Sequence, residues 1–268
     1  IACGWSPAGR YGETNWKPPS LVASDVDAAG SLGVLEKAEI RQLCFPRRVG
    51  AQPADDQPPV AIEAIDALGQ KNLLGTFHPP ALVVCDPSVL DTLDDRQLRA
   101  GYAEVVKYAL IDDPRFFGWC EANRAALIEG DRQARIHAIG HCLRSKARFV
   151  SDDLHDLHGR RALLNFGHSF GHAIEAMAAS DRVLHGEAVA TGMALAFQFS
   201  HRLGLCPRSE SERVRDHLAG AGLPTRLSDI GVAGRSHELV DLISRDKKAT
   251  GAGLTLILAR GIGAAFVA

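Results

Sequence analysis

Apolar residues recur with a helical period along most of the chain after residue 93, and this pattern predicts a mainly helical region. In the segment 94–111, for example, Leu98, Tyr102, Val105 and Ala109 form one apolar stripe behind an acidic start. Asp113-Pro114 and Asp131 are typical of helix starts. The pattern predicts helices over residues 94–111, 113–126, 131–153, 167–179, 185–205, 207–218 and 237–245.

Strand signals are confined to two places. The apolar run 81–85 follows two prolines and precedes Asp86-Pro87, which predicts a buried strand that leads into a helix. Residues 254–258 and 264–267, joined through Gly261-Ile262-Gly263, predict a closing hairpin. Residues 1–64 have Pro-Pro pairs at 18–19 and 58–59 and no sustained period, so no fold is predicted for them. The expected fold class is mainly α.

Composition excludes several function classes. The chain has 268 residues, 30 basic and 32 acidic, and its net charge of −2 offers no basic field for nucleic acid or anionic lipid. No apolar run reaches the roughly 18 residues of a membrane helix. We therefore expect neither nucleic acid nor a membrane as partner. Six cysteines without any CxxC pair, and no secretion signal after Ile1, predict reduced thiols and a cytoplasmic location.

Histidines crowd one part of the sequence, because five of the eleven lie between residues 155 and 185. His168 and His172 are four residues apart and share one helix face, while His185 is in register with a core stripe. Core histidines are either hydrogen-bonded and neutral or metal ligands. On an earlier helix, Glu104 and Lys107 are either a surface ion pair or part of the same site. One glutamate and two histidines are a standard set for a catalytic zinc ion.

Cations near these histidines suit a polyanionic ligand. Only seven of the 30 basic residues are lysines, so each lysine is conspicuous. Lys146 and Arg161 could hold phosphate or carboxylate, with Asn165 as a neutral hydrogen-bond partner, whereas Arg160 is expected to be solvated. Lys247-Lys248 is either a solvated patch or part of the same site.

Five motifs in this order resemble those of the 3-dehydroquinate synthases, which belong to the sugar phosphate cyclase superfamily. The resemblance covers about residues 65–268 and is carried by GQKNLLGTF at 69–77, AGYAEVVKY at 100–108, RALLNFGHSFGH at 161–172, HGE at 185–187 and RDKK at 245–248.

The resemblance implies roles for particular residues of the chain. The metal ligands would be Glu104, His168 and His185, holding Zn²⁺ or Co²⁺. The groups that contact the substrate would be Asn72, Lys107, Lys146, Arg161, Asn165, His172 and Lys247. The cofactor NAD would be contacted by Lys71, Val89, Leu90, Asp91 and Thr92. The resemblance, and not the helical period, separates His168 from His172.

The implied activity is that of a carbon–oxygen lyase of the shikimate pathway, which supplies aromatic amino acids. It converts 3-deoxy-arabino-heptulosonate 7-phosphate to 3-dehydroquinate and phosphate. Transient oxidation at C5 by NAD⁺ makes the neighbouring proton acidic enough for phosphate to leave. Three alternatives stay open: another sugar-phosphate cyclase, a metal-dependent polyol dehydrogenase, and a non-catalytic remnant that binds zinc.

The N-terminal part departs from the family pattern. The family has a Rossmann-like half with a GGKTG-type segment before its GKN motif, and residues 47–63 supply no such segment. We therefore predict a degenerate or frame-shifted segment at 1–64, a remnant of the NAD-binding domain at 65–92, and a helical metal- and substrate-binding domain at 93–268. The fold is then the helical domain of an α/β dehydroquinate synthase-like fold with a truncated Rossmann-like part. The expected partners are a small sugar phosphate and, in a homodimer, a second copy.

Overall fold

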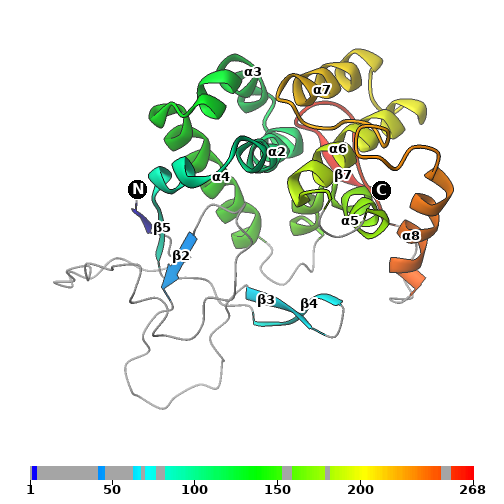
Figure 1. Cartoon of the computed structure of the whole chain (residues 1–268), viewed down its shortest axis with the longest axis horizontal. Helices are drawn as coiled ribbons and strands as arrows, with labels where there is room; N and C mark the ends of the chain where they lie inside the picture. The colour runs from blue at the N-terminus through cyan, green and yellow to red at the C-terminus, as the bar shows by residue number, and fades with distance from the viewer. Residues whose placement is uncertain are drawn as a thin grey trace. The chain divides into compact units, whose positions relative to one another are not determined.

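The computed structural model describes most of the chain after residue 81 and four short strands before it. The described residues are 2–4, 42–45, 63–67, 70–76, 82–152, 159–178, 182–248 and 255–268, with side chains from Cys85 onward except at 151–158 and 245–254. The chain divides into two compact units, Ile1–Val89 and Leu90–Ala268 (Figure 1).

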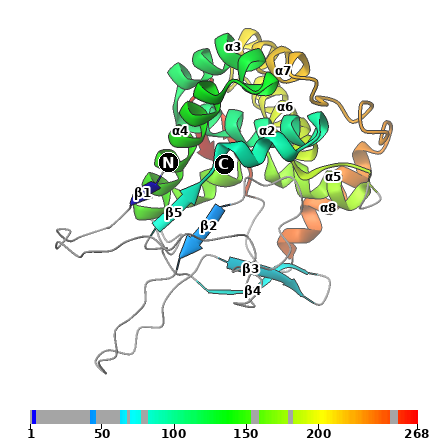
Figure 2. The same ribbon diagram turned by 60° about the vertical axis from the view of Figure 1, so that its left-hand side comes forward.

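The first unit contains a three-stranded antiparallel sheet and a hairpin. The sheet has the order β1 (Ala2–Gly4), β5 (Leu82–Cys85), β2 (Gln42–Phe45), so the predicted strand at 81–85 is confirmed as the central one (Figure 2). The hairpin pairs β3 (Glu63–Ala67) with β4 (Gln70–Thr76). All ladders among these described strands are antiparallel. The pattern did not predict β1, β2, β3 or β4, because strands of three to seven residues among glycines and prolines show no clear alternation.

The second unit is helical, and each of the seven predicted helices is confirmed with small shifts at the ends. They are α2 (Asp95–Asp112), α3 (Pro114–Glu129), α4 (Arg132–Asp152), α5 (His168–Met177), α6 (His185–Arg202), α7 (Arg208–Gly220) and α8 (Ser236–Lys248). Two 3-10 helices were not predicted, η1 (Pro87–Thr92) and η2 (Arg161–Asn165).

Three helices begin at an aspartate whose side chain caps the first turn, as the sequence predicts. The side chain of Asp94 accepts a hydrogen bond from the backbone N–H of Gln97, and Asp113 and Asp131 do the same three residues further on. Each carboxylate satisfies an N–H group that has no partner inside the helix and complements the positive helix end. Pro114 stands in the first turn of α3, where its missing N–H costs nothing.

Helix α6 is the centre of the helical unit and packs against α2, α5 and α7 (Figure 1). Its core residues Val189, Met193 and Phe197 are fully buried. Glycines allow its neighbours to approach closely, because a Cβ atom on Gly186 would overlap the carbonyl of Ala100 in α2. A Cβ on Gly192 would meet the backbone just before α5 in the same way. The backbones of α2, α5 and α6 therefore lie in direct contact.

The closing hairpin is confirmed, with β6 (Ile257–Ala259) starting later than predicted and pairing with β7 (Ala265–Val267). All three residues of β6 are buried, and the N–H of Ala259 donates to the Ser200 hydroxyl of α6 over 3.0 Å. The hairpin thus completes the core beside α6.

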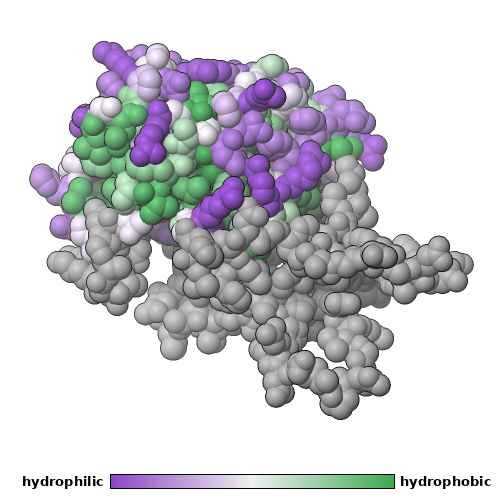
Figure 3. Space-filling model, turned by 180° about the vertical axis from the view of Figure 1, so that it is seen from behind, coloured by the Kyte–Doolittle hydropathy of each residue, from purple (hydrophilic) through white to green (hydrophobic). Residues whose placement is uncertain are grey.

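One face of the helical unit carries a hydrophobic area. On the face drawn in Figure 3, hydrophobic residues gather at the left, where hydrophilic residues are also present, and hydrophilic residues predominate at the right. The exposed large apolar side chains among the described residues include Phe199, Leu203 and Leu205, near the end of α6. Among the same residues, no helix has the length and apolar content that crossing a membrane requires.

His217 is a buried histidine outside the predicted site. It is 4% exposed and lies 2.8 Å from the hydroxyl of Tyr102, which donates to the carbonyl of Cys120. Because this carbonyl can only accept, Nε2 of His217 carries the hydrogen shared with Tyr102. Burial, with a smaller contribution from Arg124, lowers the pKa of His217 to about 4.

Acid is therefore expected to destabilise the metal-free protein through His217. Between pH 6.5 and about 4 the unfolded chain binds a proton at this residue that the folded chain excludes. The contribution, on the order of 3 kcal/mol, is present above pH 6.5 and is lost as the pH falls through this window. Urea unfolding at pH 7 and pH 4.5 should show a smaller loss of stability for His217→Gln than for the unmodified chain. Equal losses would contradict this origin.

Candidate metal centre

Three side chains from three helices converge at the junction of α2, α5 and α6. Glu104 comes from the middle of α2, while His168 and His185 are the first residues of α5 and α6. One ligand atom from each lies within 4.8 Å of the other two. The Nε2 atoms of His168 and His185 lie 3.7 and 3.9 Å from Oε1 of Glu104.

The sequence before α5 brings His168 to this point. Gly167 has a φ of +82°, which favours glycine, and a Cβ atom there would meet the side chain of Met193. Gly171, one turn later, lies against the backbone of Ala188. The first turns of α5 therefore lie directly on α6, with His168 close to the start of α6.

Hydrogen bonds at Nδ1, the ring nitrogen that does not face Glu104, orient both imidazoles. Nδ1 of His168 lies 3.3 Å from the carbonyl oxygen of Phe166, and Nδ1 of His185 lies 2.9 Å from Oε1 of Glu175. A carbonyl and a carboxylate both accept, so each Nδ1 carries the hydrogen and the lone pair of each ring is on Nε2. Both Nε2 atoms lie within 4 Å of Oε1 of Glu104.

Glu104 is ionised, and one oxygen of its carboxylate accepts no hydrogen bond from the part of the chain that the structure describes. Oε2 accepts from Nζ of Lys107 at 2.5 Å, whereas Oε1 is buried without a hydrogen bond among the described residues. Burial alone would raise the pKa of Glu104, but Lys107 and the two histidines outweigh it and lower the pKa to about 2. A buried, charged oxygen without a donor is costly unless a cation meets it.

His168 is neutral over the physiological range. Burial and the nearby Lys107 lower its pKa to about 4, more than Glu104 raises it. A neutral imidazole is the form that binds a metal, so no proton has to leave His168 first.

The residues present fit a divalent cation. Zn–N and Zn–O bonds of about 2.0–2.2 Å in a tetrahedral site place ligand atoms about 3.4 Å apart. The separations of 3.7 and 3.9 Å require only a small contraction. Two imidazoles and one carboxylate leave a fourth position open, which is the arrangement of catalytic rather than structural zinc sites.

Two further residues predicted for the site lie beside this centre. Lys107 is 7% exposed and bonded to Glu104. The ring of His172, which lies on α5 and is exposed, has its centroid 5.5 Å from that of His168 and 6.3 Å from that of His185. The structure therefore brings all three histidines of the motifs together, and it is His168, not His172, that faces Glu104 together with His185.

The other predicted site residues lie on several elements. Lys146 is exposed on α4, while Arg161 is half-buried and Asn165 exposed at the two ends of η2, which packs against α2 and α4. Asp91 in η1 is 68% exposed, and its carboxylate pairs with the buried guanidinium of Arg135 at 2.5 Å. The same 3-10 helix carries Val89, Leu90 and Thr92.

Three predictions fall on residues whose side chains lie outside the described part. Lys71 and Asn72 belong to β4, and Lys247 belongs to α8. The structure fixes only the backbone element of each, so their roles stay predictions.

Glu175 is a residue of the centre that the sequence reasoning missed. It lies on α5 and holds Nδ1 of His185. The signal was present, because His168, His172 and Glu175 are spaced by four and three residues and so share one helix face. No role followed from this spacing alone, since the partner histidine is on another helix.

Replacing Glu175 with Gln should weaken metal binding while the fold is kept. The neutral amide is a poorer acceptor, so His185 becomes less basic and less well oriented. Losing a carboxylate partner of a ligand histidine typically weakens metal affinity about 10–100-fold. Zinc titration against a chromogenic chelator measures the effect, and thermal unfolding of the metal-free protein is the control. Unchanged affinity would show that Glu175 has no part in the centre.

Two protein-family models match this chain. The model described as the 3-dehydroquinate synthase C-terminal domain matches residues 101–249, and the model of the N-terminal domain matches residues 61–100. The first of these alone covers more than half of the chain. The chain belongs to the 3-dehydroquinate synthase family. The glutamate, the three histidines and Lys107 described above all lie within the C-terminal match.

Curated relatives of this family match at high identity. The 3-dehydroquinate synthase of Zymomonas mobilis is 51% identical over 205 residues, which is 76% of this chain and 54% of that protein. The enzyme of a Ruegeria species is 46% identical over 243 residues, 90% of this chain and 64% of that protein. The second match therefore extends into residues 1–64. The chain spans about half to two thirds of the length of these relatives.

Solved structures of sugar phosphate cyclases share the fold. A 2-epi-5-epi-valiolone synthase from Streptomyces hygroscopicus, with NAD⁺ and Zn²⁺ bound, aligns with a TM-score of 0.69 and 33% identity over 78% of this chain and 57% of that chain. A 2-deoxy-scyllo-inosose synthase complexed with carbaglucose-6-phosphate, NAD⁺ and Co²⁺ aligns with a TM-score of 0.63 and 27% identity over 76% and 55%.

Proposed function

We propose that this chain is the metal- and substrate-binding part of a 3-dehydroquinate synthase. The reaction is conversion of 3-deoxy-arabino-heptulosonate 7-phosphate to 3-dehydroquinate and phosphate. The observation that carries the proposal is the buried Oε1 of Glu104, which accepts no hydrogen bond from the described residues and is faced by the Nε2 atoms of His168 and His185. Identity of about 50% to curated enzymes of this name supports the choice of reaction.

The three residues would hold Zn²⁺ or Co²⁺, the ions bound in the two solved cyclases. A divalent ion there supplies Lewis acidity toward a substrate oxygen at the open fourth position. The protein's own contribution is to keep Glu104 ionised and His168 neutral, so that the ligand set is ready at neutral pH. Glu175 keeps the Nε2 of His185 available by binding its Nδ1.

Cationic and polar groups would bind the phosphate and the carboxylate of the substrate. The proposed set is Asn72, Lys107, Lys146, Arg161, Asn165, His172 and Lys247, and for NAD it is Lys71 and Val89-Leu90-Asp91-Thr92. Lys107 and His172 lie beside the triad. Fixed cations favour a dianionic phosphate both as a substrate group and as it leaves. NAD⁺ in both solved cyclases supports NAD as the cofactor.

Identity favours the dehydroquinate reaction over those of the other cyclases. The curated 3-dehydroquinate synthases share about half of their aligned residues with this chain, against 33% and 27% for the valiolone and inosose synthases. The chemistry agrees, since the heptulosonate carries a carboxylate in addition to its phosphate and the chain offers several cations for both groups. We further propose a cytoplasmic location, a homodimer, and domain limits at residues 64 and 92.

Binding and turnover of the heptulosonate phosphate test this function. The purified chain with zinc should bind 3-deoxy-arabino-heptulosonate 7-phosphate more tightly than carbaglucose-6-phosphate in calorimetry. Adding NAD⁺ should then release phosphate, and Glu104→Gln should abolish the release. Equal affinity for both ligands, or zinc held at one equivalent without any phosphate release, would contradict the proposal and favour a non-catalytic zinc-binding remnant.

A further inference from the structure

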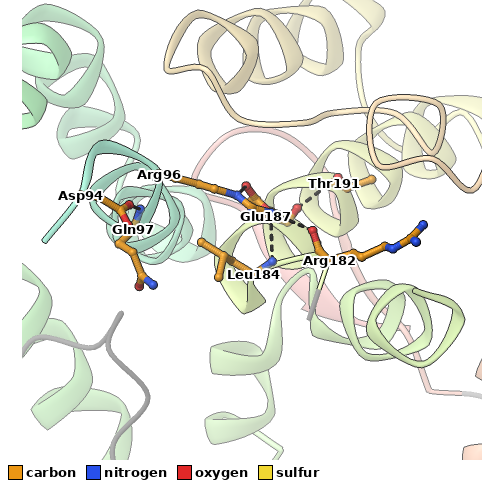
Figure 4. Close-up of polar contacts among 7 residues, drawn as sticks. All are labelled: Asp94, Arg96, Gln97, Arg182, Leu184, Glu187 and Thr191. Atoms are coloured by element: carbon orange, nitrogen blue, oxygen red, sulfur yellow. Dashed lines mark hydrogen bonds and ion pairs between the residues drawn. The ribbon is translucent and has the colours of Figure 1, made fainter. Parts of the chain in front are cut away.

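A bidentate ion pair joins α2 to the start of α6 away from the three converging ligands. Nε and Nη2 of Arg96 donate to Oε1 and Oε2 of Glu187 at 2.6 and 2.7 Å (Figure 4). The Glu187 side chain is only 14% exposed, whereas Arg96 is 53% exposed. Two parallel charge-assisted bonds fix orientation as well as distance. Neither residue was assigned a role from the sequence.

The same two side chains also hold the segment that leads into α6. Nη2 of Arg96 donates to the carbonyl of Arg182 at 2.8 Å, and Oε2 of Glu187 accepts from the N–H of Leu184 at 2.9 Å. Figure 4 shows these contacts grouped around the Arg96 guanidinium and the Glu187 carboxylate, with the side chain of Arg182 directed away. Two backbone groups just before the start of α6 are therefore tied to α2 through one guanidinium and one carboxylate.

Consecutive residues of α6 contact successive turns of α2. Gly186 meets the backbone of Ala100, Glu187 bonds to Arg96 one turn earlier on α2, and His185 faces Glu104 one turn later. Helix α6 thus crosses α2 at Gly186, with the ion pair on one side of the crossing and the metal ligands on the other. A rotation of α6 about this crossing would move His185 relative to Glu104.

His185 is the first residue of α6, and helix ends fray, so the position of its ring follows that of the first turn. Its side chain is 39% exposed. The contacts of the ring include those to Glu175, Glu104 and the two other histidines. The position of its Nε2 therefore depends on the backbone of the first turn of α6.

We propose that Arg96 and Glu187 are positioning residues of the metal centre, which set the separation of His185 from Glu104 and thereby the affinity for the metal. The inference rests on the proposed metal site and adds to it two residues outside the group of three proposed ligands. Changes outside the ligand shell act on metal affinity because the ligands must be held in a fixed geometry.

The test compares this ion pair with a matched one elsewhere. Arg213 on α7 makes the same bidentate contact with Glu121 on α3, at 2.8 and 2.5 Å, and is 49% exposed. Arg96→Met and Arg213→Met therefore remove bidentate ion pairs in which the arginines are similarly exposed, at 53% and 49%. Arg96→Lys keeps the charge but cannot make the bidentate contact, and it guards against a folding defect in Arg96→Met. Zinc affinity and the melting temperature of the metal-free protein are measured for each variant.

We expect Arg96→Met and Arg96→Lys to weaken zinc binding about 10-fold. This is the lower end of the about 10–100-fold loss of metal affinity that follows when residues supporting metal ligands are replaced. The visible spectrum of bound Co²⁺ should change as well, while Arg213→Met keeps both properties and loses a similar amount of thermal stability. Normal zinc binding by the Arg96 variants, or equal weakening by Arg213→Met, would overturn the positioning role alone. Absence of zinc binding by the unmodified chain would instead overturn the metal centre, and the positioning role with it.

Discussion

Replacing Glu104 with Gln is expected to lower zinc affinity by at least about 100-fold. Glu104 is a proposed ligand, so the loss should exceed the about 10–100-fold typical of residues that only support the ligands. The amide removes the negative charge that Oε1 directs toward the two imidazoles. It also leaves the buried ammonium of Lys107 without its counter-ion. Breaking a fully buried pair by removing one partner costs about 3–5 kcal/mol. Glu104 is one third exposed, so the loss here should be smaller, and the metal-free variant should unfold at a lower temperature.

A double variant separates these two effects. Glu104→Gln combined with Lys107→Met removes both charges and should recover most of the lost stability. It should not recover zinc binding, because the carboxylate ligand is still missing. Chelator competition and thermal unfolding measure the two quantities on the same samples. Tight zinc binding by the double variant would show that Glu104 is not a ligand.

Replacing Gly186 with Ala should cause the largest loss of stability of any methyl addition in α6. Helix propensity alone would favour alanine by about 1 kcal/mol. The added Cβ, however, would overlap the carbonyl of Ala100, which is backbone and cannot turn aside. Separating α2 from α6 to make room should cost 3 kcal/mol or more, at or above the usual range for overpacking of about 1–3 kcal/mol. It would also move His185 away from Glu104, so zinc binding should fall as well.

Gly118→Ala is the matched control for this prediction. Gly118 lies within α3, and a Cβ atom there would meet nothing within 4 Å. The substitution should therefore be neutral or stabilise the protein by up to about 1 kcal/mol. Urea unfolding of the two variants checks the contrast. Similar stabilities for both would mean that α2 and α6 are not in backbone contact.

The helices were predictable because two independent local signals agree in them. Apolar stripes define their buried faces, and Asp94, Asp113 and Asp131 begin three of them through hydrogen bonds that depend only on neighbouring residues. The strands of the first unit depend instead on partners far along the chain, such as Cys3 and Cys44 on either side of Val83. No local pattern contains that pairing.

The candidate centre was predictable only as far as it depends on spacing within one helix. Spacing placed His168 and His172 on one face but could not choose between them, because the choice depends on the turn at Gly167 and on the place where α5 meets α6. Only the family resemblance pointed to His168 in advance. Glu175 and Arg96 were missed, since each acts on a residue of another helix. Contacts made where helices cross are set by packing and not by sequence spacing.

The central claim is that Glu104, His168 and His185 bind one divalent ion together. Crystals of the chain grown with zinc, measured on both sides of the zinc absorption edge, test it most directly. The predicted result is a single strong anomalous peak in the helical unit, about 2.0–2.2 Å from the Glu104 carboxylate and from Nε2 of each histidine. A peak bound to other residues, or no peak at this junction when zinc is in excess, would contradict the claim.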